Sequence, residues 1–387
     1  MVTDQGNDEE ERDLDSMIED QHWDEVYERF RNFPENTKAI VNPSLGWTKL
    51  HWLCSIGASP PALIDLVASL YPEAVTMPDN RYGDTPLHIV CRNSQISAEK
   101  IVVLLQHIIS NEELLIRNRF GGTALHSAAN HNAVLAVLQA LVGANRRILT
   151  MTTHDGIHSV TALWSSYNST IPGVTCVAQI LNGEIEAQRR EGFLRFWRKV
   201  EYLSSEFFTC KNEDNITSNE DPNRFVLHGL IHCNVPINLF KVALKVNPAL
   251  ANTVDSDGNT SLHILLENRP YRLKEREAIM ALLDASPQAA FIANNSGEVP
   301  LLIAIRNKIP WINGTGDVVE AATPLISRRD NATGLYPFQL AALHGGKVAV
   351  ETTFLLLSIK PDLLQTQNKD GMGMDNRPRG ARLDDLL

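Results

Sequence analysis

The apolar residues of this chain fall into pairs of short helical stripes that are separated by turns. Leu87, Val90 and Cys91 lie on one face of a helix that follows a turn. Thr85 stands where a helix N-cap is expected, and Pro86 suits the first helical position because its missing N–H would have no partner there. A second apolar stripe comes next and comprises Ile101, Val102, Leu104, Leu105 and Ile108. Two such helices cannot bury this surface alone, so neighbouring units must cover it.

This unit recurs along most of the chain. The stretch from Gly83 to Cys91 has counterparts before and after it, and one position in each copy is a His or its replacement: His51, His88, His126, Trp164, His228, His263, Leu302 and Gln339. The intervals between these positions are 37, 38, 38, 64, 35, 39 and 37 residues. A fixed period of this size predicts a stacked repeat array.

The sequence Thr85-Pro86-Leu87-His88 after a glycine-containing turn resembles the ankyrin repeat, whose usual period is about 33 residues. The resemblance covers roughly residues 20–368, and the copies here are longer than the usual repeat. It implies an all-α fold, an ankyrin-like solenoid of about eight stacked helix-turn-helix units with disordered termini. It also implies that the recurring His joins adjacent turns through hydrogen bonds and does not bind a metal.

Three parts follow from this arrangement. Residues 1–18 are predicted to be an acidic, disordered N-terminus, because they are highly charged and contain few apolar groups. The array covers 19–368 and begins with a capping helix at about 20–34, whose apolar face is formed by Trp23, Val26, Tyr27 and Phe30. Residues 369–387 are predicted to be a disordered C-terminal tail.

The interval of 64 residues breaks the period and indicates an insertion at about 183–222. It contains a predicted helix at 184–208 with an aromatic face (Phe193, Phe196, Trp197 and Phe207) and basic residues around it (Arg189, Arg190, Arg195, Arg198 and Lys199). In one interpretation this helix is the second helix of the fourth copy, and its aromatic residues are core. In the other it protrudes and offers a basic face to a partner or to an anionic membrane surface.

The negative charge is concentrated at the N-terminus. The net charge is −11, of which residues 1–20 carry −8 and the remainder −3. A nearly neutral folded part argues against a broad nucleic-acid-binding surface. The five cysteines form no Cys-x-x-Cys pair, which favours a reducing compartment. With no signal peptide and no long apolar segment, we expect a monomer in the cytoplasm or the nucleus that binds no membrane.

No sequence pattern predicts catalysis. Gly345-Gly346-Lys347 lacks the glycine spacing of a phosphate-binding loop. Cys210 with His228, or Cys233 with His232, lacks a third group that would orient the pair. We therefore expect no enzyme activity, no cofactor and no metal site.

A binding surface can be placed on the chain through the resemblance. In ankyrin arrays the partner meets the turn tips and the ends of the first helices, which line a concave face. The matching positions here are Leu45, Trp47, Arg81, Tyr82, Asp84, Arg92, Asn93, Arg119, Phe120, Asn130 and His131. Arginine and aromatic side chains are enriched at interface hot spots. Tyr82 and Phe120 each follow an arginine and are either the anchors of a partner or packing contacts between turns.

The resemblance predicts a scaffold or adaptor that binds another protein, whose identity the sequence does not give. Two alternatives stay open. The chain could be a substrate-recruiting or regulatory subunit of a larger enzyme complex. It could also bind a membrane surface through the basic-aromatic helix at 184–208.

Overall fold

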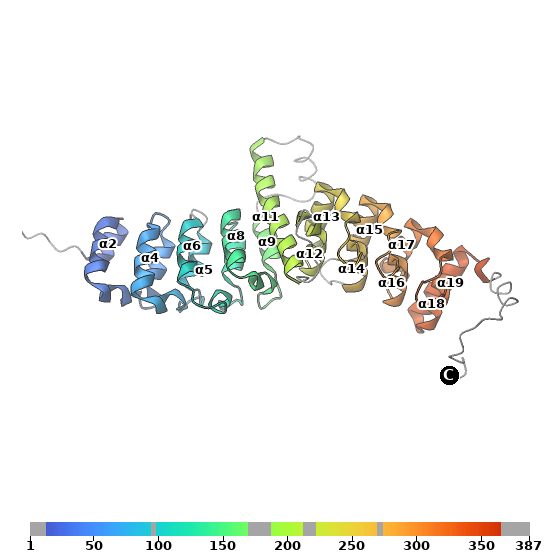
Figure 1. The fold of residues 1–387 in the computed structure, drawn as a ribbon, viewed down its shortest axis with the longest axis horizontal. Coiled ribbons are helices and arrows are strands. Elements are labelled where there is room, and N and C mark those ends of the chain that lie inside the picture. The colour runs from blue at the N-terminus through green and yellow to red at the C-terminus, as the bar shows by residue number, and fades with distance from the viewer. Residues whose placement is uncertain (1–12, 94–97, 169–186, 212–221, 269–273, 365–387) are drawn as a thin grey trace, which may run out of the picture. The chain divides into compact units, whose positions relative to one another are not determined.

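The computed structural model describes residues 13–93, 98–168, 187–211, 222–268 and 274–364 (Figure 1). These residues are mostly helical, which confirms the all-α prediction. The chain divides into two compact units, Met1–Val242 and Ala243–Leu387. The predicted C-terminal tail and the first twelve residues lie outside the described part of the chain.

The first unit consists of short helix pairs joined by turns. Its α-helices are α1 (Leu14–Glu19), α2 (Trp23–Asn32), α3 (Lys49–Ser55), α4 (Pro61–Leu70), α5 (Pro86–Arg92), α6 (Ala98–Gln106), α7 (Ala124–Asn130), α8 (Leu135–Ala144), α9 (Ser159–Asn168), α11 (Ala187–Lys211) and α12 (Val226–His232). A helix α13 (Ile237–Val246) contains the division between the units. The 3₁₀ helices are η1 (Pro34–Lys38), η2 (Pro72–Val75), η3 (Glu113–Leu115), η4 (Arg146–Thr150) and η6 (Pro222–Phe225).

Successive pairs stack along the first unit. The first helices α3, α5, α7 and α9 contact one another in order, as do the second helices α4, α6 and α8, which lie side by side in Figure 1. A two-stranded antiparallel hairpin, β1 (Ile40–Asn42) and β2 (Trp47–Thr48), precedes α3, with Ile40 opposite Thr48. The layers between helices are closed by fully buried side chains such as Leu50, Ile64, Leu104 and Leu138. Burial of these apolar groups supplies most of the stabilisation of such short helices.

The repeated Thr and His residues join each turn to the next. In the first copy the backbone N–H of Thr48 lies 3.3 Å from Nδ1 of His51, and the same distance at Thr85 and His88 is 3.3 Å. Since Nδ1 accepts this bond, Nε2 carries the proton and donates to a carbonyl of the following turn. These carbonyl contacts measure 3.3 Å for His51 to Asp84, 3.1 Å for His88 to Gly122 and 3.0 Å for His126 to Ile157.

The turn tips themselves are linked by backbone hydrogen bonds. The N–H of Asn80 donates to the carbonyl of Leu45, and the N–H of Arg119 to that of Tyr82, at 2.7 and 2.8 Å. The next tip repeats the pattern at 3.0 Å, from His154 to Phe120. The tips therefore form a row in which each turn is fixed by its neighbour.

The N-terminus is ordered further toward its start than we predicted. Disorder was expected up to residue 18, but Leu14–Glu19 forms α1, and Leu14 and Ile18 are buried. These residues are one helical turn apart and pack as a pair. The carboxylate of Asp15 also forms an ion pair with the buried amine of Lys49 on α3. The predicted capping helix is present as α2, and 3₁₀ helix η1 begins at Pro34.

Helix α11 occupies the predicted insertion, and its aromatic face is core. Phe193, Phe196, Trp197 and Phe207 are all at most 3% exposed. Lys199 donates to the carbonyl of Asn132 at 3.0 Å, as Lys100 on α6 donates to the carbonyl of Ile56 at 2.9 Å.

The matching lysines place α11 where the second helix of the fourth copy belongs. The aromatic residues are therefore core, as the first interpretation predicted. Arg190, Arg195 and Arg198 stay exposed, so binding of a partner or an anionic membrane surface through these basic residues stays a prediction. Residues 183–186 and 212–221 of the insertion lie outside the described part.

The second unit contains the same kind of pairs. Its helices are α14 (Ser261–Asn268), α15 (Glu275–Ala285), α16 (Pro300–Arg306), α17 (Thr315–Ala321), α18 (Pro337–Leu343) and α19 (Lys347–Ile359), with 3₁₀ helices η7 (Pro248–Asn252), η9 (Pro287–Ala290), η10 (Trp311–Asn313) and η11 (Thr323–Ser327). Contacts run from α14 to α16 to α18 and from α15 to α17. In the described residues of the whole chain, no helix is long and apolar enough to cross a lipid bilayer.

Candidate functional site

A hollow of about 270 Å³ lies at the turn tips of the first two copies. We call it the Tyr82 hollow, and it is lined by Leu45, Trp47, Ser55, Asp79, Arg81, Tyr82, Ile89, Arg92 and Asn93. Six of these nine are among the partner-binding residues predicted from the sequence. The hairpin β1–β2 contributes one wall, and the turn before α5 together with α5 itself contributes the other.

Asp79 fixes the shape of this hollow. Its Oδ1 accepts hydrogen bonds from the N–H of Tyr82 at 2.7 Å and from that of Asp84 at 3.2 Å, and its Oδ2 accepts from Nε1 of Trp47 at 3.4 Å. Burial alone would raise the pKa of Asp79, but these donors outweigh it and lower the pKa. One ionised carboxylate thus holds both the turn and the indole of the preceding copy.

Two guanidinium groups lie against one aromatic ring in the hollow. The Cζ atoms of Arg81 and Arg92 are 4.8 and 5.0 Å from the centroid of Tyr82. Arg92 also pairs with the carboxylate of Asp84, at 2.5 Å. Arg81, in contrast, is exposed and has no ion pair among the described residues. Cation–π contacts of this kind hold an arginine in place while its outer N–H groups stay available.

The next turn extends the same surface. Tyr82 and Phe120 have ring centroids 6.0 Å apart and an interplanar angle of 33°. Phe120 is nevertheless 59% exposed, and Arg119 beside it is exposed as well. Both interpretations of these aromatic residues therefore have support, since the two rings pack on each other and still leave apolar area open to a partner.

The charges around the hollow are unevenly exposed. Asp79 and Asp84 are 5% and 0% exposed, whereas Arg81 and Arg119 are exposed. The following turn adds one exposed carboxylate, Asp155. The surface around the Tyr82 hollow is therefore basic and aromatic, although the chain as a whole is acidic.

Asp84 was predicted to contact a partner, and its burial shows that this prediction is wrong. Its carboxylate is fully buried, where it accepts a hydrogen bond from Nδ2 of Asn118 at 2.9 Å and pairs with Arg92. A group in this position orients the side chains around it and cannot touch a partner directly. This burial could not be predicted from the sequence, because the partners of Asp84 lie in a neighbouring turn and at the far end of α5.

Of the remaining predicted residues, one lies in the Tyr82 hollow and two lie outside it. Asn130 and His131 are exposed at the end of α7 and do not line the hollow. Asn93 lies within it and donates from Nδ2 to the carbonyl of Ser55 at 3.2 Å. Sequence reasoning missed three lining residues: Ser55, Asp79 and Ile89. Of these only Asp79 had a local signal, because Asp commonly begins a turn by accepting backbone N–H groups.

In the described residues, no group of three or more His, Cys, Asp and Glu side chains is arranged so that it could hold a metal ion. Cys54 and Cys91 are buried, and burial raises the pKa of Cys54 to about 12 and raises that of Cys91 further. Both are therefore thiols at neutral pH and poor nucleophiles.

Comparison with known proteins gives no relative from which a role could be transferred. No family model matches the chain, and a search of curated protein sequences finds no match either.

Proposed function

We propose that this chain is a divergent ankyrin-repeat array that acts as a scaffold or adaptor and binds an acidic segment of another protein at the Tyr82 hollow. The repeat assignment is supported by the Thr–His pairs that cap the first helices α3, α5 and α7 and reach the next turn. It is also supported by the glycines at the tips, since Gly46, Gly83 and Gly121 have φ of 65°, 68° and 76°.

The observation that carries the binding proposal is the pair of guanidiniums on Tyr82. Arg81 and Arg92 present N–H donors beside an apolar floor made by Trp47 and Ile89. The nearby carboxylates of Asp79 and Asp84 are buried and already hold hydrogen bonds. Asp84 is paired with Arg92, so Arg81 is the guanidinium of the two that has no ion pair among the described residues. A partner segment that combines a carboxylate with an apolar or aromatic side chain complements this surface.

The test compares two variants of the full chain in a pull-down followed by identification of the bound protein. The first replaces Arg81, Tyr82, Arg119 and Phe120 by Ala. The matched control removes two arginines and two apolar residues that are exposed elsewhere on the first unit: Arg147, Ile109, Arg195 and Leu194. Circular dichroism checks that both variants fold.

We expect the intact chain and the control to retain a partner that the first variant loses, with at least a tenfold drop in affinity, since hot-spot residues contribute about 2 kcal/mol or more. A peptide that covers the bound segment of that partner should lose affinity when its acidic residues are changed to amides. Equal binding by both variants would place the partner elsewhere on the chain.

A further inference from the structure

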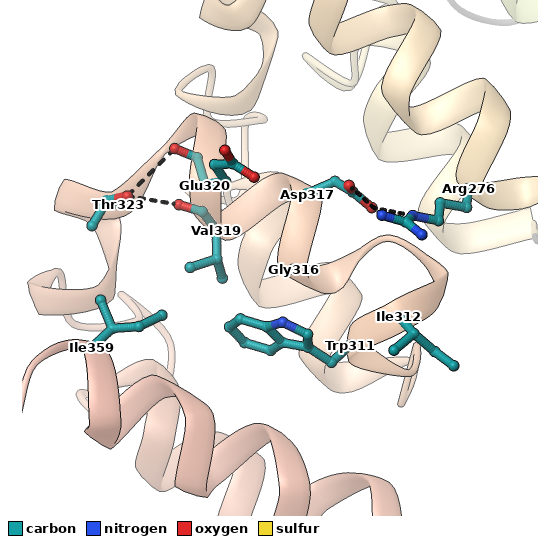
Figure 2. A pocket seen from close by; sticks show the side chains of 9 residues that line it. All are labelled: Arg276, Trp311, Ile312, Gly316, Asp317, Val319, Glu320, Thr323 and Ile359. Atoms are coloured by element: carbon teal, nitrogen blue, oxygen red, sulfur yellow. Dashed lines mark hydrogen bonds and ion pairs between the residues drawn. The ribbon is translucent and has the colours of Figure 1, made fainter.

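The second unit has a hollow of its own with the opposite electrostatic character. It has a volume of about 410 Å³ and is lined by Arg276, Trp311, Ile312, Gly316, Asp317, Val319, Glu320, Thr323 and Ile359. We call it the Trp311 hollow. In Figure 2 the indole lies across the hollow from Glu320, with Ile359 toward one end and Ile312 toward the other.

The indole of Trp311 lies close to helix α17 at Gly316. A Cβ atom at Gly316 would lie 2.6 Å from Nε1 of Trp311, so only glycine lets the ring lie this close to the helix. No hydrogen bond of the indole N–H occurs among the described residues. The ring therefore presents an aromatic surface to the hollow.

The polar groups of the hollow leave one negative charge without a partner. Arg276 is bound by both oxygens of Asp317, with Nε–Oδ2 and Nη2–Oδ1 distances of 3.0 and 3.2 Å. The hydroxyl of Thr323 donates to the carbonyl of Val319 at 3.0 Å. In the described part of the chain the carboxylate of Glu320 forms no ion pair and no hydrogen bond. The lining thus has a net charge of −1.

The apolar walls are unusually open. Ile312 is 68% exposed and Ile359 is 43% exposed. An aromatic surface, apolar walls and one unpaired carboxylate together match a side chain with an aliphatic stem and a cationic head.

We propose that the Trp311 hollow binds a basic side chain, lysine or arginine, of a partner protein, with the alkyl stem on Trp311 and the cation at Glu320. This site is separate from the Tyr82 hollow, and its binding does not depend on the function proposed for that hollow. The two hollows select opposite charges, because among the described residues the lining ion without an ion pair is Arg81 in one and Glu320 in the other.

The test uses the full chain and two N-acetylated, C-amidated tripeptides, Leu-Lys-Leu and Leu-norleucine-Leu. The norleucine peptide keeps the alkyl stem and lacks the ammonium group. Binding is followed by the indole N–H signal of Trp311 in NMR spectra, which a Trp311→Phe variant identifies among the six tryptophans. We expect saturable shifts of this signal by the lysine peptide with a dissociation constant on the order of 1 mM.

Two comparisons decide the role of the charge. The norleucine peptide should bind about tenfold more weakly, because it loses both the cation–π contact and the ion pair. Glu320→Gln should weaken the lysine peptide about threefold, because only the ion pair is lost. Glu351→Gln removes an equally exposed carboxylate on α19 that does not line the hollow, and it should leave binding unchanged.

A further variant tests the position of the ring. Gly316→Ala should move the indole, shift its signal in the absence of peptide and weaken the lysine peptide. The proposal is overturned if both peptides bind equally, if the Trp311 signal does not respond to the lysine peptide, or if Glu351→Gln weakens binding as much as Glu320→Gln. Arg81→Ala should leave this binding unchanged, which separates the result from the outcome at the Tyr82 hollow.

Discussion

The two units join their successive turns in different ways. In the first unit, three consecutive turns are linked through His51, His88 and His126. Among the described residues of the second unit, only His263 forms such a link, from Nε2 to the carbonyl of Glu298 at 3.2 Å. The following copies have Leu302 and Gln339 at this position. The two turns that His263 links also share a backbone bond, since the N–H of Asn295 donates to the carbonyl of Asp257 at 2.9 Å.

The difference shows that the histidine has two separable roles. Gln339 keeps the first role, because its Oε1 accepts from the N–H of Tyr336 at 2.9 Å and caps the helix. Leu302 keeps neither and is instead 4% exposed in the apolar layer. Stacking at Leu302 therefore depends on the apolar layer, and a histidine at this position adds a capping bond and an inter-turn bond.

We expect the largest difference in stability between the two units when the pH is lowered. Burial lowers the pKa of His51, His88 and His263, and it lowers that of His126 to about 4. Protonation would put a proton on Nδ1, where the Thr N–H already points, so the folded state favours neutral histidine. The stabilisation is complete above the unfolded value of about 6.5 and is lost as the pH falls toward 4.

For His126 alone this loss is up to about 3 kcal/mol. With three such histidines against one, the first unit should lose more protection than the second. Amide hydrogen exchange at pH 7 and pH 4.5, corrected for intrinsic rates, measures both units in one sample. Equal losses in the two units would contradict the assignment of the histidines as the source.

The next effect compares two glycines with the same backbone conformation. Gly121 and Gly334 have φ of 76° and 71°. A Cβ at Gly121 would lie 2.7 Å from the backbone N of His154. A Cβ at Gly334 would have no described atom within 4 Å, apart from those of its two chain neighbours. Gly334→Ala should cost about 1 kcal/mol from its φ alone. Gly121→Ala should cost about 3 kcal/mol, since the next turn must also move.

Urea unfolding of the two variants measures this difference, with the slope of the transition as a check that both unfold in the same way. If the two substitutions have the same effect, the turn tips are not in the close contact described here.

The smallest effect separates the two roles of the histidine. His126→Gln should retain the capping bond, as Gln339 does, and lose the bond to Ile157, at a cost of about 1 kcal/mol. His126→Leu should cost about 2 kcal/mol, because it leaves the N–H of Thr123 and the carbonyl of Ile157 without partners in a buried layer. Thermal unfolding of the two variants should rank them in this order. A glutamine variant as unstable as the leucine variant would mean that the inter-turn bond is the dominant contribution.

Much of the fold was predictable because its signals are local. The period, the turn glycines and the Thr-Pro-Leu-His stretch all lie within a few residues of one another, and each has a direct conformational consequence. The same holds for the six hollow residues found from the sequence, since four of them lie at turn tips and Arg92 and Asn93 lie at the end of a first helix. Helix α1 was missed because its two buried apolar residues, Leu14 and Ile18, stand among acidic residues and depend on contacts beyond the helix.

The sequence by itself determined that the chain folds as repeated helix pairs, with a glycine at most turn tips and a Thr–His cap on several of the first helices. Only the tertiary structure decided that Asp84 is buried, that α11 is a core helix, and that Arg81 and Arg92 share the ring of Tyr82. The physical reason is that these outcomes depend on contacts between residues that are distant along the chain. Asp84 with Asn118 and Lys199 with Asn132 are 34 and 67 residues apart. Exposure and charge pairing at a site are fixed only when such neighbours are in place.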